Sequence, residues 1–285
     1  MRIVRTVADL RTAVRSARDA GAQIGLVPTM GALHAGHLAL VRQAREQSGF
    51  VVVSIFVNPA QFNDPSDLAR YPRDEAADAA MLSDVGTDVL FAPTLEEVYP
   101  AGFATTVSVA GLSEPLEGVV RGAKHFQGVA TVVIKMLNMV QPDEAVIGQK
   151  DAQQALVIRR LVRDLNLPVR IEIHPTVREP DGLAMSSRNV QLDADARRRA
   201  PAISRALHAV EAAVTGGERD TARALAAGAP ILADAQISPE YFAAVSTDTL
   251  EPIGTVTGET LIAIAARVGA VRLIDNVIVA PGAHP

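Results

Sequence analysis

Residues 22–58 read AQIGLVPTMGALHAGHLALVRQAREQSGFVVVSIFVN, and this stretch decides the fold that we expect. Residues 22–29 and 50–58 are continuous and mostly apolar, which is typical of parallel strands that are covered on both faces. Residues 37–47, between them, have their apolar side chains at helical spacing. A strand, a glycine-bearing turn, a helix and a second strand make a βαβ unit.

The same alternation continues to residue 175. The further elements that we expect are a helix over 74–85, a strand over 88–93, an apolar stretch over 129–140, a strand over 144–148, a helix over 151–166 and a strand over 169–175. Alternating helices and strands predict an α/β fold with a Rossmann-like, doubly wound parallel sheet. In such a sheet the ligand sites lie at the carboxyl ends of the strands.

After residue 175 the pattern changes, because elements of one type follow one another. A turn-rich loop over 178–189 leads to the further elements, which are helices over 193–215 and 219–235 and strands near 240–247, 260–266 and 271–279. This grouping predicts a separate, smaller α+β domain. We therefore expect two domains, over residues 1–175 and 176–285.

The composition excludes several classes of function. The chain has 285 residues, of which 48% are hydrophobic and 21% charged, as in a soluble globular protein. A net charge of −5 argues against a nucleic-acid partner, and few aromatic residues (4%, no Trp) argue against a stacking platform for single strands. The absence of cysteine excludes disulfides, thiolate nucleophiles and cysteine-type zinc sites.

Neither the N-terminus nor the uncharged stretch after it predicts targeting to a membrane or organelle. Ile3, Val7, Leu10 and Val14 have helical spacing, and nearby acids make a folded surface helix a better interpretation than a transit peptide. Residues 20–41 lack formally charged side chains, but a proline, four glycines and two histidines are unlike a membrane span. We expect a cytoplasmic protein with no membrane partner.

His34 and His37 lie where the first strand gives way to its helix. A pair with this spacing can bind zinc on a helix, but zinc needs at least a third ligand and the next acid is Glu46. The amino end of a helix offers free N–H groups and a positive dipole end to an anion. Gly31 and Gly36 would let a phosphate approach the backbone closely. The position therefore favours a phosphate site.

Two further segments carry groups that suit phosphate. Lys150 is one of only three lysines among 27 basic residues, and it lies at a strand-to-helix junction. The alternative is an ordinary solvated lysine near the start of a helix. Residues 184–189, AMSSRN, place two hydroxyls and a guanidinium in a loop, as a phosphate clamp does. The alternative here is that serine and asparagine only cap the helix that begins near Asp193.

Several of these segments together resemble one enzyme family. HAGH resembles the HxGH signature of class I nucleotidyl-transferring enzymes, and PTMGALHAGHL more narrowly resembles the pantothenate synthetases, or pantoate–β-alanine ligases. GQKDAQQ (148–154) is similar to the family segment GEKDxQQ, and AMSSRN is similar to its KMSKS-type loop. The resemblance runs through six segments, in the right order, across most of the first 190 residues.

The resemblance implies an activity and a set of roles. The expected reaction is ATP-dependent condensation of (R)-pantoate with β-alanine through a pantoyl adenylate, with ATP and Mg²⁺, by a homodimer that binds no nucleic acid. The first domain would bind ATP and pantoate, and the second would be a lid that carries the MSSR loop. By resemblance, the catalytic residues are His34, His37 and Lys150, the substrate-binding residues are Asn58, Gln61, Arg121 and Gln154, and the metal ligand is Asp78. The residues that the resemblance assigns to ATP binding are Met30, Gly31, Ala32, Leu33, His34, Ala35, Gly36, His37, Gly148, Gln149, Lys150, Asp151, Val177, Met185, Ser186, Ser187 and Arg188.

The sequence departs from the family in four places. Ile147 replaces the usual Phe, and Gln149 replaces the usual Glu. Ala77 replaces the first acid of the pair that helps to hold Mg²⁺ in the family, and only Asp78 remains of that pair. The alternative for Asp78 is therefore a solvated acid on a helix surface. VVRGAKHFQGV (119–129) has one extra residue, although its arginine and His125 match. The remaining histidines, His174, His208 and His284, are expected to be structural or surface residues.

Three other functions share parts of this pattern. A class I aminoacyl-tRNA synthetase has HxGH and a serine loop, but the acidic charge balance argues against it. A nucleotidyltransferase that acts on a phosphate acceptor would release pyrophosphate without forming an acyl adenylate. A nucleotide sensor would bind ATP without turnover.

Overall fold

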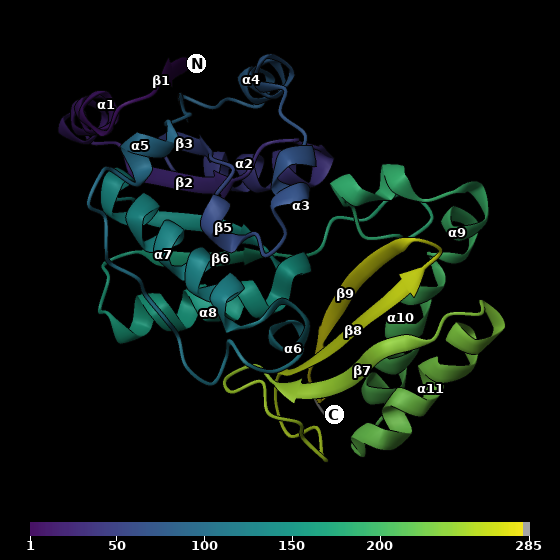
Figure 1. The fold of residues 1–285 in the computed structure, drawn as a ribbon. Coiled ribbons are helices and arrows are strands. Elements are labelled where there is room, and N and C mark those ends of the chain that lie inside the picture. The colour runs from purple at the N-terminus through teal and green to yellow at the C-terminus, as the bar shows by residue number, and fades with distance from the viewer. Residues whose placement is uncertain (282–285) are drawn as a thin grey trace. The chain divides into compact units, whose positions relative to one another are not determined.

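A computed structural model describes residues 1–281, and Figure 1 shows its fold. The chain divides into two compact units. The first comprises Met1–Gln149 and Gln153–Pro175, and the second comprises Lys150–Ala152 and the described chain from Thr176 onward. Whereas the sequence placed Lys150 in the first domain, the structure groups it with the second unit. His284 lies outside the described residues.

The first unit is built on a six-stranded sheet in which every pair of neighbours is parallel, in the order β1-β4-β3-β2-β5-β6. The strands are β1 (Arg2–Val4), β2 (Ile24–Thr29), β3 (Phe50–Ile55), β4 (Val89–Phe91), β5 (Glu144–Gly148) and β6 (Arg170–His174). The second unit contains an antiparallel sheet, so the expected α/β fold with a smaller α+β part is confirmed.

Helices cover both faces of the parallel sheet, as the continuous apolar runs predict. Leu26 of β2 and Val52 of β3 belong to the core formed with α1, α7 and α8, whereas Val27 and Val53 belong to the core formed with α2 and α4. The covering helices are α1 (Val7–Asp19), α2 (Ala35–Gln47), α4 (Glu75–Asp84), α7 (Ala123–Val140) and α8 (Ala152–Asp164).

Strand β2 lies at the point where the winding of the sheet reverses. The chain proceeds from β2 through β3 and β4 in one direction, and β5 then pairs with the other side of β2. Because the strands are parallel, the segments that follow β2 and β5 leave the sheet at the same edge. Such a reversal is where open α/β sheets bind their ligands.

The expected helix at the N-terminus is partly wrong. Residues Arg2–Val4 form the edge strand β1, and α1 begins only at Val7, after Thr6 accepts a hydrogen bond from Asp9 N through its side chain. The partner of β1 is β4, more than eighty positions away, and helical periodicity cannot reveal such a pairing. The short elements not predicted from the sequence are η1 (Pro59–Gln61), α3 (Pro65–Arg70), α5 (Leu95–Val98), α6 (Glu117–Arg121), η2 (Gln149–Asp151) and η3 (Ser187–Gln191).

The second unit packs helices against its three-stranded antiparallel sheet. The strands are β7 (Pro239–Ser246), β8 (Thr260–Val268) and β9 (Val271–Val279), and the helices are α9 (Ala194–Arg199), α10 (Ala202–Thr215) and α11 (Thr221–Asp234). Helix α10 contacts β8 and β9, and α11 contacts β7. The single helix expected over 193–215 is divided because Pro201 cannot donate a backbone hydrogen bond. Among the described residues, no helix is long and apolar enough to cross a membrane.

We expect Gly228→Ala to destabilise the second unit. A Cβ at Gly228 of α11 would lie 2.7 Å from the carbonyl oxygen of Ala206 on α10 and 3.1 Å from the ring of Phe242. Overpacking of this kind costs about 1–3 kcal/mol, which exceeds the gain of about 1 kcal/mol from replacing a helical glycine by alanine. Urea unfolding should show a lower free energy of unfolding.

The matched control is Gly258→Ala, since a Cβ at Gly258 would meet no atom within 4 Å. An unchanged or higher unfolding midpoint for Gly228→Ala would show that the two helices do not depend on this close approach.

Candidate functional site

The loop between β2 and α2 has a backbone that few residues adopt. Gly31 has a φ of +80° and Ala32 a φ of +52°, so the chain turns sharply directly after Met30. The hydroxyl of Thr29 accepts a hydrogen bond from Gly31 N at 3.2 Å and donates one to Ser54 O at 2.8 Å. The turn is thereby tied to the neighbouring strand β3.

The two histidines of the HxGH segment cap helix α2. His34 is the residue before the first turn, and its Nδ1 accepts a hydrogen bond from Gly36 N at 3.2 Å. His37 Nδ1 accepts one from His34 N at 3.4 Å, and the two ring centroids are 4.1 Å apart. Because both Nδ1 atoms accept, each neutral ring carries its hydrogen on Nε2. The caps thus fix the tautomer that makes Nε2 a donor.

Asp78 of α4 holds the same loop from the other side. Its Oδ2 accepts from Ala32 N at 3.0 Å and its Oδ1 accepts from Leu33 N at 2.8 Å. The residue is only 3% exposed, so the alternative that Asp78 is a solvated acid on a helix surface is wrong. A Cβ at Gly31 would lie 3.0 Å from Asp78 Oδ2. Asp78 therefore fixes the turn that Gly31 makes possible.

The contacts that the structure shows for Asp78 are those of a group that supports the loop. Both carboxylate oxygens accept backbone N–H groups, and the side chain is buried beneath the loop. Across residues 1–281, no group of three or more histidine or acidic side chains could hold a metal ion. The expected role of Asp78 as a metal ligand stays a prediction.

Gln61 lies in a buried network of amides directly after β3. Asn58 donates from Nδ2 to Gln61 Oε1 at 3.0 Å and to Gly128 O at 3.1 Å, and Gln61 Nε2 lies 3.0 Å from Met30 Sδ. Asn58 Oδ1 accepts from Ala60 N and from the hydroxyl of Tyr99. Asn58 is 1% exposed. Since its amide is used by protein atoms, Asn58 supports Gln61, whereas the sequence predicted that it contacts substrate.

Two rings complete the support of Gln61. Burial raises the pKa of Tyr99 to about 12, so its hydroxyl remains a donor to Asn58 at neutral pH. His125 Nδ1 lies 2.7 Å from the carbonyl oxygen of Gln61, and because a carbonyl only accepts, this Nδ1 carries the hydrogen. Both the backbone and the side chain of Gln61 are therefore held in place.

Arg121 and the glutamine pair of α8 have contacts that the sequence did not predict. The guanidinium of Arg121 pairs through Nε with the buried carboxylate of Glu117 at 2.8 Å, and its expected contact with a substrate carboxylate stays a prediction. Gln153, which the sequence did not single out, is buried and hydrogen-bonds Leu112 O, Pro115 O and Glu117 N. Gln154, the expected substrate ligand, is half-buried in the first turn of α8.

The second unit carries the other expected phosphate ligands. The side chain of Lys150 is 20% exposed and its Nζ lies 3.5 Å from Asp151 Oδ1. Ser186 accepts from Arg188 N at 3.2 Å and so caps η3, which contains Ser187 and the exposed Arg188. The expected alternative, capping of the helix near Asp193, does not describe Ser186, since Asp193 itself caps α9.

The structure thus distributes the expected ATP-binding residues over the two units. In the first unit they follow β2, end β5 or begin the η2 turn, and in the second they lie in the rest of that turn, in the segment that leads into η3 and in η3 itself. Those of the first unit are Met30, Gly31, Ala32, Leu33, His34, Ala35, Gly36, His37, Gly148 and Gln149, and those of the second are Lys150, Asp151, Val177, Met185, Ser186, Ser187 and Arg188.

We expect Asp78→Asn to loosen the loop without unfolding the chain. Asparagine keeps one acceptor oxygen but turns an NH₂ group toward the other backbone N–H and removes the charge. Hydrogen bonds to charged groups contribute about 1.5–3 kcal/mol, so the amides of Ala32 and Leu33 should exchange at least about tenfold faster. Residue-resolved hydrogen exchange by NMR measures this directly.

Asp84→Asn is the control, because Asp84 is exposed on the same helix. Equal protection of both loop amides in Asp78→Asn and in the unchanged chain would contradict the role that we give to Asp78.

Comparisons with known proteins agree over nearly the whole chain. A family model described as pantoate-β-alanine ligase matches residues 2–278. A pantothenate synthetase of Cereibacter sphaeroides is 52% identical over 275 residues, covering 96% of this chain and 98% of that protein. One of Moorella thermoacetica is 50% identical over 281 residues, covering 98% of each.

Solved structures give the same result. The pantothenate synthetase of Thermus thermophilus has a TM-score of 0.91 and 48% identity, covering 99% of this chain and all (100%) of that one. A pantoate-β-alanine ligase of Francisella tularensis, described as complexed with β,γ ATP and β-alanine, has a TM-score of 0.78 and 32% identity, covering 98% and 97%. With the HxGH loop, the parallel sheet and these matches together, the chain belongs to the pantoate–β-alanine ligase family.

Proposed function

We propose that this chain, an ATP-dependent ligase of its family, joins pantoate to β-alanine through a pantoyl adenylate and releases AMP and pyrophosphate. The observation that carries the proposal is the HxGH loop, whose two histidines use Nδ1 for capping and so direct hydrogen-bearing Nε2 atoms away from the helix backbone. Family membership supplies the substrates.

The loop after β2 would hold the phosphates of ATP. Helix α2 begins at Ala35 with its positive dipole end, and the Nε2–H groups of His34 and His37 would donate to phosphate oxygens there. Donors that are fixed before the substrate arrives need no reorganisation when charge develops in the transition state. The bonds from Asp78 and Thr29 provide that fixation here.

The second unit would supply the positive charge. Lys150 offers a compact ammonium to the phosphates, Ser186 and Ser187 offer hydroxyl donors, and Arg188 offers a planar fork that suits two phosphate oxygens. The backbone of Val177 would contact the adenine, as the family resemblance implies.

The acid substrate would lie against Gln61 and Gln154. Gln61 is held by Asn58 and His125, so its orientation does not depend on the ligand. Arg121, whose Nε pairs with Glu117, would add a guanidinium for the substrate carboxylate, as the family resemblance implies.

The reaction then needs positioning and charge stabilisation more than a protein nucleophile. A pantoate carboxylate oxygen attacks the α-phosphorus, the bond from the α-phosphorus to the oxygen bridging to the β-phosphorus breaks, and pyrophosphate leaves. The β-alanine amine attacks the acyl carbon, the bond to AMP breaks, and the amine loses a proton. In such group transfers most of the acceleration comes from alignment and fixed dipoles.

Three further properties belong to the proposal. ATP would enter as its Mg²⁺ complex, since Mg²⁺ keeps water ligands and usually binds through substrate phosphates more than through an all-protein cage. A homodimer is supported by a mean hydropathy of +0.19 and by the exposed apolar residues Val119 and Val120. A cytoplasmic location agrees with the absence of cysteine.

The first test is exchange of labelled pyrophosphate into ATP, with Mg²⁺, measured separately with pantoate, with β-alanine and with a panel of amino acids. We expect exchange with pantoate alone, because the pantoate carboxylate is the group that is adenylated, whereas β-alanine enters only in the second step, through its amine. Exchange driven by an amino acid would move the chain to the synthetase class. ATP binding without any exchange would indicate a sensor, and either result would overturn the proposal.

The roles of single donors are tested by His37→Ala and Lys150→Ala. Loss of one donor to the developing charge should lower the exchange rate by about 10²–10³, as removal of an oxyanion-hole donor does. The matched controls are His208→Ala and Lys124→Ala, which replace exposed residues of the same types. A fall of less than about tenfold in a folded variant would remove that residue from the proposed site.

A further inference from the structure

Two adjacent side chains of strand β9 contact Arg178 and Lys150 of the second unit. Asp275 is 4% exposed and Asn276 is 3% exposed, so both polar groups are buried. Neighbouring residues of a strand point to opposite faces, and here one contacts Arg178 while the other contacts Lys150. Neither residue lies in a motif, so sequence reasoning did not single out this pair.

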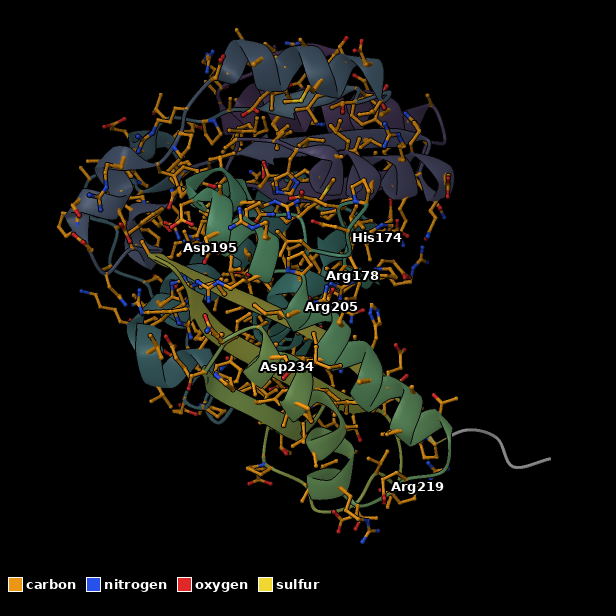
Figure 2. The ribbon with its side chains drawn as sticks, turned by 90° about the vertical axis from the view of Figure 1, so that its right-hand side faces the viewer. His174, Arg178, Asp195, Arg205, Arg219 and Asp234 are labelled. Carbon is orange, nitrogen blue, oxygen red and sulfur yellow. The ribbon has the colours of Figure 1, made fainter. Side chains whose placement is uncertain are left out.

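Asp275 holds Arg178 by two parallel hydrogen bonds. Arg178 Nη1 donates to Asp275 Oδ2 at 2.6 Å and Nη2 donates to Oδ1 at 3.1 Å, and Figure 2 labels Arg178. The same Nη1 donates to Gly182 O at 3.1 Å. A bidentate pair between a guanidinium and a carboxylate fixes direction as well as distance. The orientation of Arg178 is therefore set by β9.

Arg178 begins the short hairpin that presents the serine loop. Arg178 bridges to Ala184, and Met185 N donates to Val177 O at 2.9 Å. Asn189 Nδ2 donates to Ala184 O at 3.1 Å on the far side of the two serines. The hairpin ends at residue 185, so Ser186 follows it directly.

Asn276 holds the backbone of Lys150, whose ammonium is the proposed phosphate ligand. Its Nδ2 donates to the carbonyl oxygen of Lys150 at 3.0 Å, across 126 positions of sequence. Lys150 lies in the η2 turn, and this contact accompanies its grouping with the second unit. The backbone position from which the Lys150 side chain extends is thereby held by β9, the same strand that holds Arg178.

We propose that Asp275 and Asn276 are positioning residues that set the distance between the Lys150 ammonium and the Ser186–Arg188 loop, so that both meet one nucleoside triphosphate. This inference rests on the proposed function of Lys150 and the loop in phosphate binding. A displacement of about 1 Å at a reacting group can lower a rate by about 10²-fold, so a pair that fixes two such groups to one strand has a direct effect on adenylate formation.

The test is a double-mutant cycle of Asn276→Ala with Lys150→Ala, and the first readout is binding of α,β-methylene-ATP by calorimetry. We expect Asn276→Ala to weaken binding about tenfold, and the double variant to bind as Lys150→Ala alone does, because contacting groups that act as a unit are non-additive in this way. The pyrophosphate-exchange rate should repeat the pattern, while the KM for β-alanine stays unchanged.

Asp275→Asn tests the other half of the pair in a cycle with Arg188→Ala, and it keeps the proposal testable if Asn276→Ala fails to fold. The matched control is Glu240→Gln, which breaks the ion pair of Glu240 with Arg272 in the same sheet and touches neither phosphate segment. We expect the control to bind the analogue as the unchanged chain does.

Two results would overturn the inference. One is unchanged analogue binding in folded Asn276→Ala and Asp275→Asn. The other is additive losses in both cycles, since these would mean that the pair acts through general stability. Failure of the proposed function can be told apart from failure of this inference by assays of the chain without substitutions. If the proposed function is wrong, that chain would bind the analogue but show no pantoate-dependent exchange. The binding cycles would still test the positioning role.

Discussion

The parallel pairing of β2 with β3 on one side and β5 on the other is the constraint on which the site depends. Because neighbouring parallel strands end at one edge, the segments after β2 and β5 leave the sheet together. The reversal of winding at this point keeps the crossover helices from covering the edge. The HxGH loop lies there because it directly follows β2, the strand at which the winding reverses, and the rest of the first unit supports its position.

A second principle is that contacts within the protein fix the polar groups of the proposed site. The histidines use Nδ1 to cap α2, which leaves hydrogen on Nε2 of the neutral rings. The amide of Asn58 donates to Gln61 and is itself held by Gly128, Ala60 and Tyr99, and Asp78 uses both oxygens to hold the loop backbone. Preorganised donors of this kind stabilise developing charge without reorganisation cost. In this molecule the supporting polar groups are buried, where a hydrogen bond is electrostatically stronger than in water.

The departures from the sequence predictions have a common cause. Asp78 and Asn58 were expected to contact a metal ion and a substrate because both follow motifs that bind ligands. Both are buried, and their partners are backbone or amide groups of distant segments. Arg121 illustrates the same limit, since its Nε pairs with Glu117, four residues earlier. Residue type and spacing identify the region of a site, but they do not tell which of its polar residues face the ligand.

The sequence by itself determined the alternation of strands and helices, the position of the phosphate loop and the family, because these depend on local periodicity and on contiguous motifs such as PTMGALHAGHL. Only the tertiary structure decided the hydrogen-bond partners of Asp78, Asn58 and Asn276, which lie 46, 70 and 126 positions away. It also decided that residues Arg2–Val4 form a strand. A hydrogen bond between distant segments depends on the packing that brings them within about 3 Å, and no local pattern of residues carries that information.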